Sequence, residues 1–132
     1  DPVNYAGFVA SNVVRGDARV CHVPDAIHPT DGQVLLDVRT PAEVAEGTIP
    51  GARHVPLDEL RERVEELPAE KEYLVFCAVG LRGYLACRIL DQHGRRTRNL
   101  TGGYRTYKAV QAMLDEDDQA RRELHEDTGM KT

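Results

Sequence analysis

The chain has 132 residues, 41% of them hydrophobic and 30% charged, and its formal net charge is −5 at pH 7. This length is enough for one domain with a proper core, while the acidic balance without a basic stripe argues against a nucleic-acid-binding surface. The longest apolar stretches are far shorter than a membrane span. The three cysteines, which lack a Cys-x-x-Cys spacing, exclude a disulfide framework and favour a reducing cytoplasm.

Residues 1–17 are predicted to form an amphipathic helix that precedes the main domain. Asp1 can cap this helix, Pro2 suits its first turn and Gly16 suits its end. The chain opens without the basic segment of a secretory signal, and the lack of an initiator Met suggests an excised fragment.

Short apolar segments alternate with helical patterns across residues 18–114, the predicted main domain. Strands are expected at 19–23, 34–38, 54–55, 73–76 and 96–100, and helices at 40–46, 58–67, 83–93 and 104–114. Thr40 and Glu43 form a capping box at the first of these helices. The alternation predicts an α/β fold, with a central, mostly parallel sheet of five strands and helices on both faces. The active site of such a sheet lies at the carboxyl ends of its strands.

Residues 115–132 are dense in charge. We expect a solvated helix followed by a frayed tail, or alternatively a linker to a further domain.

Cys77 lies between the buried strand at 73–76 and the helix at 83–93, on a tight turn in which Gly80 is free to take a positive φ. A thiol in this position points at backbone N–H groups of a helix N-terminus, with Arg82 five residues further on. Such groups lower a thiol pKa and hold an anion beside it. The pattern predicts a nucleophilic cysteine; the alternative is a buried structural cysteine at a strand end.

The loop after Cys77 narrows the predicted chemistry. Cysteine-dependent phosphatases use a His-Cys-x5-Arg loop, whereas here the spacing is Cys-x4-Arg and Phe76 replaces the His. The smaller ring of backbone N–H groups in a shorter loop suits a sulfur atom attached to Cys77 better than a whole phosphate. The residues predicted to bind a persulfide through this loop are Ala78, Val79, Gly80, Leu81, Arg82 and Gly83. Arg82 is expected to steer an anionic donor, the alternative being an exposed helix-start cation or an ion pair.

The other two cysteines are interpreted as structural. Cys21 neighbours His22, but one such pair without further ligands is more typical of a strand than of a metal site. Cys87 lies on the helix ten residues after Cys77, where packing is favoured over a role as resolving thiol.

Five motifs recur in an order typical of one family. They are Asp37-Val-Arg39, Glu43, Ile49-Pro-Gly-Ala52, Cys77-Ala-Val-Gly-Leu-Arg82 and Asn99-Leu-Thr-Gly-Gly-Tyr104. The set resembles the rhodanese (sulfurtransferase) domain over residues 20 to 114, which implies a rhodanese-like three-layer fold. The resemblance also implies that Asp37 and Arg39 support the active-site loop from behind. Thr48, Val44 and Tyr107 depart from residues common in the family.

The resemblance implies transfer of sulfane sulfur through a Cys77 persulfide. Donors would be thiosulfate, polysulfide or a coenzyme A-type persulfide, and the acceptor a thiol or another nucleophile. Residues 1–17 resemble the stretch after the dimerisation domain of flavin-dependent coenzyme A-disulfide reductases. A reductase domain is therefore a possible partner in a parent protein, and FAD and coenzyme A are expected only there. No cofactor, metal, nucleic acid or membrane is expected for this chain.

Two other classes of function stay open. A small-anion cysteine enzyme acting on phosphate or arsenate would use a similar loop, although the short spacing and the missing His count against it. A catalytically silent binding module is the other alternative, although such modules typically lose the loop cysteine.

Overall fold

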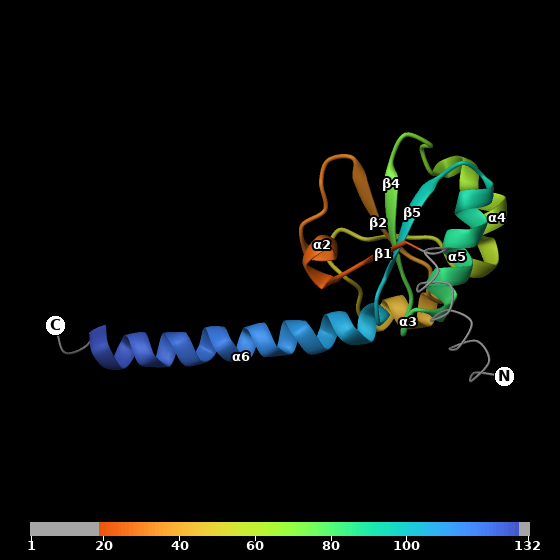
Figure 1. Ribbon diagram of the computed structural model, residues 1–132. Helices are drawn as coiled ribbons and strands as arrows, with labels where there is room; N and C mark the ends of the chain where they lie inside the picture. The colour runs from red at the N-terminus through yellow and green to blue at the C-terminus, as the bar shows by residue number, and fades with distance from the viewer. Residues whose placement is uncertain (1–18, 130–132) are drawn as a thin grey trace.

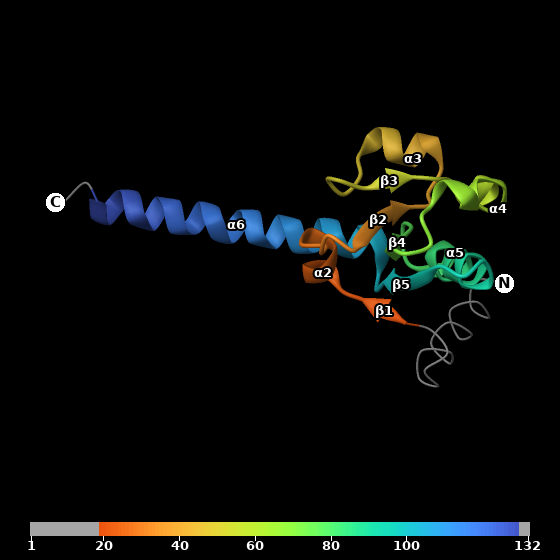
Figure 2. The ribbon, with the colours of Figure 1, turned by 90° about the horizontal axis from the view of Figure 1, so that it is seen from above.

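The computed structural model describes residues 19–129, and the helix predicted for residues 1–17 lies outside them. The strands are β1 (Val20–Cys21), β2 (Gln33–Asp37), β3 (Arg53–His54), β4 (Glu72–Phe76) and β5 (Arg96–Leu100). They form a sheet in the order β1-β5-β4-β2-β3, and every neighbouring pair is parallel (Figure 2). The predicted α/β fold class is therefore confirmed.

Helices cover both faces of this sheet. They are α2 (Val23–Ile27), α3 (Pro41–Glu46), α4 (Leu60–Arg63), α5 (Leu81–Gln92) and α6 (Gly103–Gly129), and 3-10 turns at Leu57–Glu59 and Val64–Glu66 flank α4. In Figure 1, α4 and α5 lie on one side of the strands and α2 lies on the other, while α6 projects far beyond the domain. None of the described helices has the length and apolar character needed to cross a membrane.

The core divides into two apolar clusters, one on each face of the sheet. Successive side chains of β4 point to opposite faces, so Tyr73 and Val75 join the cluster under α4 and α5. Leu74 and Phe76 join the cluster under α2 and the first turns of α6. Because all four side chains are completely buried, β4 is the central strand that carries the Cys77 loop.

Three elements differ from the sequence prediction. Helix α2 was not expected; it begins where the His22 N–H donates to Asp25 Oδ2 at 2.9 Å, a cap without the usual Ser or Thr. The helix expected at 58–67 is instead a short α-helix between two 3-10 turns. Helix α6 continues through the predicted boundary between residues 114 and 115 without a break.

The strand register gathers the candidate residues at one edge of the sheet. Asp37 pairs with Phe76 across β2 and β4, and Val75 pairs with Asn99 across β4 and β5. The carboxyl ends of these three strands therefore lie side by side. In Figure 1, α3 and the starts of α5 and α6 meet at this edge.

Candidate active site

Cys77 is the first residue after β4 and lies at the base of the predicted loop. Its side chain is buried, and the Gly80 N–H donates to Sγ at 3.1 Å. Gly80 has φ 114° and ψ −21°, which places it in the left-handed region directly before α5 begins at Leu81. The loop thus turns a backbone donor toward the sulfur, and this is the arrangement that stabilises a sulfur anion.

The first turn of α6 holds the Cys77 loop through its backbone. The Tyr104 N–H donates to the Cys77 carbonyl at 2.8 Å, and the Arg105 N–H donates to the Ala78 carbonyl at 3.0 Å. These bonds satisfy donors that a helix N-terminus would otherwise leave unpaired. A Cβ on Gly103 would lie 2.4 Å from the Cys77 carbonyl oxygen, so the approach requires glycine.

Substitution of Gly103 by Ala is expected to destabilise the protein more than substitution of Gly94 by Ala. Both glycines have positive φ, 61° and 78°, so each variant loses about 1–2 kcal/mol for the left-handed conformation. An added Cβ at Gly94 meets nothing within 4 Å, whereas at Gly103 it meets the Cys77 carbonyl. That clash costs about 1–3 kcal/mol more. Urea unfolding of the two variants measures the loss in the free energy of unfolding. Equal losses would show that the close contact between Gly103 and the Cys77 carbonyl does not limit the side chain at this position.

Asn99 fixes the loop from β5, although the sequence prediction gave it no role. Its Nδ2 donates to the Gly80 carbonyl at 2.8 Å, and its Oδ1 is buried without a hydrogen-bond partner. A Cβ on Gly83 would lie only 2.2 Å from that Oδ1, so Gly83 makes room for the amide. Gly83 therefore serves packing of the loop against β5. An Asn at the end of a strand beside the loop was the signal available in the sequence.

Arg82 forms an ion pair, the alternative considered for it in the sequence. Its two terminal nitrogens donate to the two carboxylate oxygens of Glu43 at 2.6 and 2.8 Å. The hydrogen bonds from Arg82 are the main reason that the pKa of Glu43 falls to about 2, and in turn Glu43 raises the pKa of Arg82. Glu43 also caps α3 with Thr40, as predicted. The pair ties α3 to the Cys77 loop and neutralises the Arg82 charge.

Asp37 and Arg39 form a buried ion pair behind the loop. Arg39 Nε donates to Asp37 Oδ1 at 2.9 Å and a terminal nitrogen donates to Oδ2 at 2.7 Å, with the two side chains 4% and 1% exposed. The same nitrogen donates to the Gly47 carbonyl, and Thr48 Oγ1 donates to Asp37 Oδ2 at 2.8 Å. The Arg39 guanidinium lies 4.1 Å from the centre of the Tyr104 ring, and this cation–π contact connects the ion pair to α6.

The pair thus supports the loop indirectly, through the Tyr104 backbone that holds Cys77. His54 also contacts this ion pair through the backbone, because its Nε2 lies 2.7 Å from the Arg39 carbonyl oxygen.

The other two thiols are buried in the core and are not disulfide-bonded to Cys77. Burial is the main reason that the pKa values of Cys21 and Cys87 rise to about 12. Both thiols are therefore protonated at neutral pH and poor nucleophiles. Within residues 19–129, no group of three or more His, Cys, Asp or Glu residues is placed to hold a metal ion.

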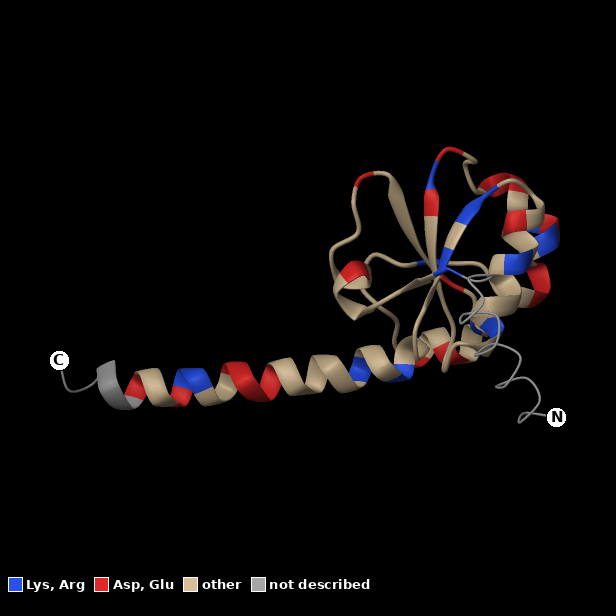
Figure 3. Cartoon of the chain, in the orientation of Figure 1, with Lys and Arg blue, Asp and Glu red and all other residues tan. Residues whose placement is uncertain are grey.

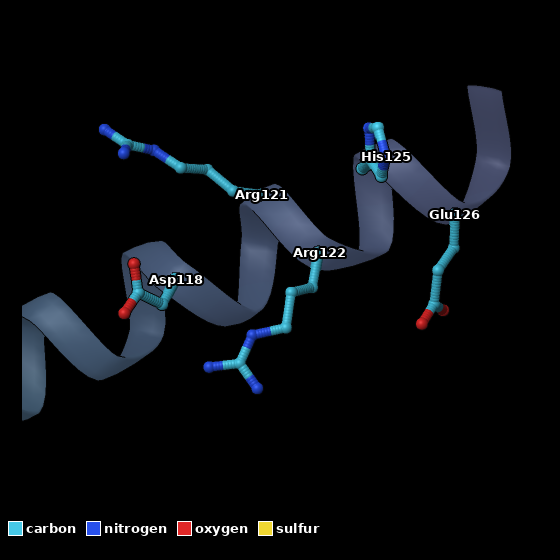
Figure 4. A pocket seen from close by; sticks show the side chains of 5 residues that line it. All are labelled: Asp118, Arg121, Arg122, His125 and Glu126. Atoms are coloured by element: carbon cyan, nitrogen blue, oxygen red, sulfur yellow. The ribbon is translucent and has the colours of Figure 1, made fainter. Parts of the chain in front are cut away.

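A depression of about 390 Å³ lies beside the loop, lined by Ala78 and Val79 together with residues of α3 and α6. A second depression, of about 460 Å³, lies along the distal half of α6 (Figure 4). Its lining residues all come from one exposed helix, so it has no opposing wall and offers no enclosed site.

Comparison with known proteins agrees with this arrangement. The rhodanese-like domain model matches residues 25–110. A protein of Allochromatium vinosum named sulfurtransferase is 41% identical over 75 residues, covering 56% of this chain and 70% of that protein.

Two solved structures contain a similar domain within a longer chain. The reduced Bacillus anthracis CoADR-RHD is 40% identical with a TM-score of 0.75, covering 83% of this chain and 20% of that one. An NAD-dependent persulfide reductase from A. fulgidus is 38% identical with a TM-score of 0.62, covering 78% of this chain and 18% of that one. The chain thus spans about a fifth of these two proteins, and its resemblance to the rhodanese domain of a coenzyme A-disulfide reductase is confirmed.

Proposed function

The chain belongs to the rhodanese-like domain family, and on that premise we propose that it is a sulfurtransferase that carries sulfane sulfur on Cys77. The observation that carries the proposal is the Gly80 N–H, 3.1 Å from Cys77 Sγ at the end of the central strand. A donor in this position stabilises a thiolate before sulfur arrives. Relatives named as sulfurtransferases support the assignment.

The proposed reaction has two half-reactions. In the first, the Cys77 thiolate attacks the outer sulfur of thiosulfate, a Cys–S–S bond forms, and the S–S bond of the donor breaks to release sulfite. In the second, an acceptor thiolate attacks the terminal sulfur of the protonated persulfide. The bond to Cys77 then breaks, the acceptor leaves as a persulfide, and Cys77 returns as thiolate. No oxidant or reductant is consumed in either step.

The range of donors follows from access to the thiol. Cys77 is only 1% exposed, so a donor must present its reacting sulfur end-on at the loop. Thiosulfate, polysulfide and an organic persulfide such as that of coenzyme A all offer such a terminal sulfur. The proposal includes a reducing compartment, the cytoplasm, in which Cys77 stays a thiol. It also includes a flavin-dependent reductase domain as partner, by analogy with the two longer proteins.

Intact-protein mass after incubation with thiosulfate, and separately with coenzyme A persulfide, tests the proposal. We expect the gain of one sulfur atom, and peptide mapping should place it on Cys77. Cys21 and Cys87 should stay unmodified at neutral pH because their pKa values are near 12. No adduct on a folded, reduced sample would overturn the proposal and favour a catalytically silent module, while sulfur distributed over all three cysteines would argue against a specific carrier.

A further inference from the structure

The depression beside the Cys77 loop has rims of opposite charge. Glu43 and Glu46 of α3 line one side, and Arg105 and Lys108 of α6 line the other. Figure 3 shows the basic bands where α6 leaves the domain. A ligand that reaches the loop across this depression therefore passes between an acidic wall and a basic wall.

The two arginines at the loop, Arg82 on the loop and Arg39 behind it, are already paired. Arg82 is bound at both terminal nitrogens by Glu43, and Arg39 is bound by Asp37. Arg105 and Lys108, by contrast, are exposed, and none of the carboxylates in residues 19–126 forms an ion pair with either. An anion that approaches the loop thus meets these two charges instead of Arg82.

The electrostatics of the helix do not favour the position of these two cations, and their one ring contact within the described residues is that of the Lys108 ammonium, 5.9 Å from the centre of the Tyr104 ring. They lie in the first two turns of α6, the end of a helix at which positive side chains are disfavoured and acidic ones are preferred. Three residues apart, they are neighbours on one side of the helix. Two cations held together at this end, beside the loop, indicate a use in binding.

We propose that Arg105 and Lys108 bind the carboxylate or phosphate of the organic thiol that takes sulfur from Cys77. This inference rests on the proposed sulfur transfer and names the class of acceptor. Val79, a large apolar side chain on the loop that is 58% exposed, contacts the carbon chain between that anion and the reacting sulfur. Glu46 on the opposite wall repels the anion and so turns it toward α6.

The second half-reaction, isolated from the first, tests the inference. The protein is loaded with thiosulfate and freed of excess donor, and the loss of sulfur from Cys77 is then followed by mass. Acceptors are glutathione, which carries carboxylates, coenzyme A, which carries phosphates, and neutral 2-mercaptoethanol. In the Arg105→Gln, Lys108→Gln double variant, the second-order rate constant should fall about three- to tenfold for the anionic thiols and stay unchanged for 2-mercaptoethanol. The difference in rate constant between the double variant and the unsubstituted protein should shrink at high salt.

A matched control is available on the same helix. Arg121 and Arg122 lie in the distal half of α6, where their side chains point to opposite sides of the helix (Figure 4). The Arg121→Gln, Arg122→Gln variant changes net charge equally and should leave all three rates unchanged. The inference is overturned if the rate constants for the anionic thiols fall equally in both double variants, or if they do not fall in the Arg105→Gln, Lys108→Gln variant. Neither outcome would contradict sulfur transfer itself. Failure to load Cys77 at all overturns the proposed function as well. The thiol with the larger fall shows whether carboxylate or phosphate is preferred.

Discussion

Replacing Cys77 by Ser is expected to lower the rate of sulfur transfer at least about 10³-fold. A serine hydroxyl can still accept the Gly80 N–H at the position of Sγ, so the loop keeps its shape. It cannot form a persulfide, however, so the first half-reaction has no product. Steady-state turnover with thiosulfate and a thiol acceptor measures the loss. A transition midpoint in urea close to that of the unsubstituted chain would show that the variant is folded.

The control for this result is Cys87→Ala. Cys87 is buried in the same apolar cluster as Cys77, but the Gly80 N–H donates to the sulfur of Cys77. We expect it to lose some stability through the small cavity and to keep its turnover. Substantial transfer by the Cys77→Ser protein would instead identify Cys77 as a buried structural thiol.

Replacing Arg39 by Met is expected to lower the free energy of unfolding by about 3–5 kcal/mol. The substitution leaves the Asp37 carboxylate buried without its partner, and it also removes the hydrogen bond to the Gly47 carbonyl. The contact with the Tyr104 ring is lost at the same time. Urea unfolding monitored by circular dichroism gives the value.

An exposed arginine offers the comparison. Arg63 pairs with Glu59 and Glu66 on the surface, where water screens the charges, so Arg63→Met should cost far less stability than Arg39→Met. The double variant Asp37→Asn, Arg39→Met should recover part of the loss, because it removes the unpaired charge. If Arg39→Met costs no more than Arg63→Met, the buried pair does not support the fold in the way described.

The fold could be predicted largely from local patterns. Residues 73–76 read as a strand because a short run of apolar, β-branched and aromatic residues is bounded by turns, and a strand was expected at 96–100 after the helix end at His93 and Gly94; the structure places β4 and β5 there. The capping box at Thr40 predicted the start of α3. Helix α2 was missed because a His-capped turn has no strong local signal, and in the helix expected at 58–67 only Leu60–Arg63 is α-helical, with a 3-10 turn on each side.

The candidate site was predictable only in part, because its contacts join residues far apart in the chain. The turn after β4 pointed to Cys77 and its loop from sequence alone. The pairing of Arg82 with Glu43 spans 39 residues, so only the tertiary structure brings them together. The same holds for Asn99, whose amide reaches Gly80 from the neighbouring strand. Charges that look available in a sequence can thus be neutralised by a partner that the local pattern does not name.

Helix α6 also sets how far the chain extends from the domain. From Ala112 to Glu126 its residues are exposed, and pairs within the helix, such as Asp117 with Arg121 at 3.1 Å, take the place of tertiary contacts. At 1.5 Å per residue, the segment from Ala112 to Gly129 spans about 27 Å. A flexible tether of the same number of residues would let its far end fold back onto the domain. The continuous helix instead holds Gly129 away from the entrance to Cys77.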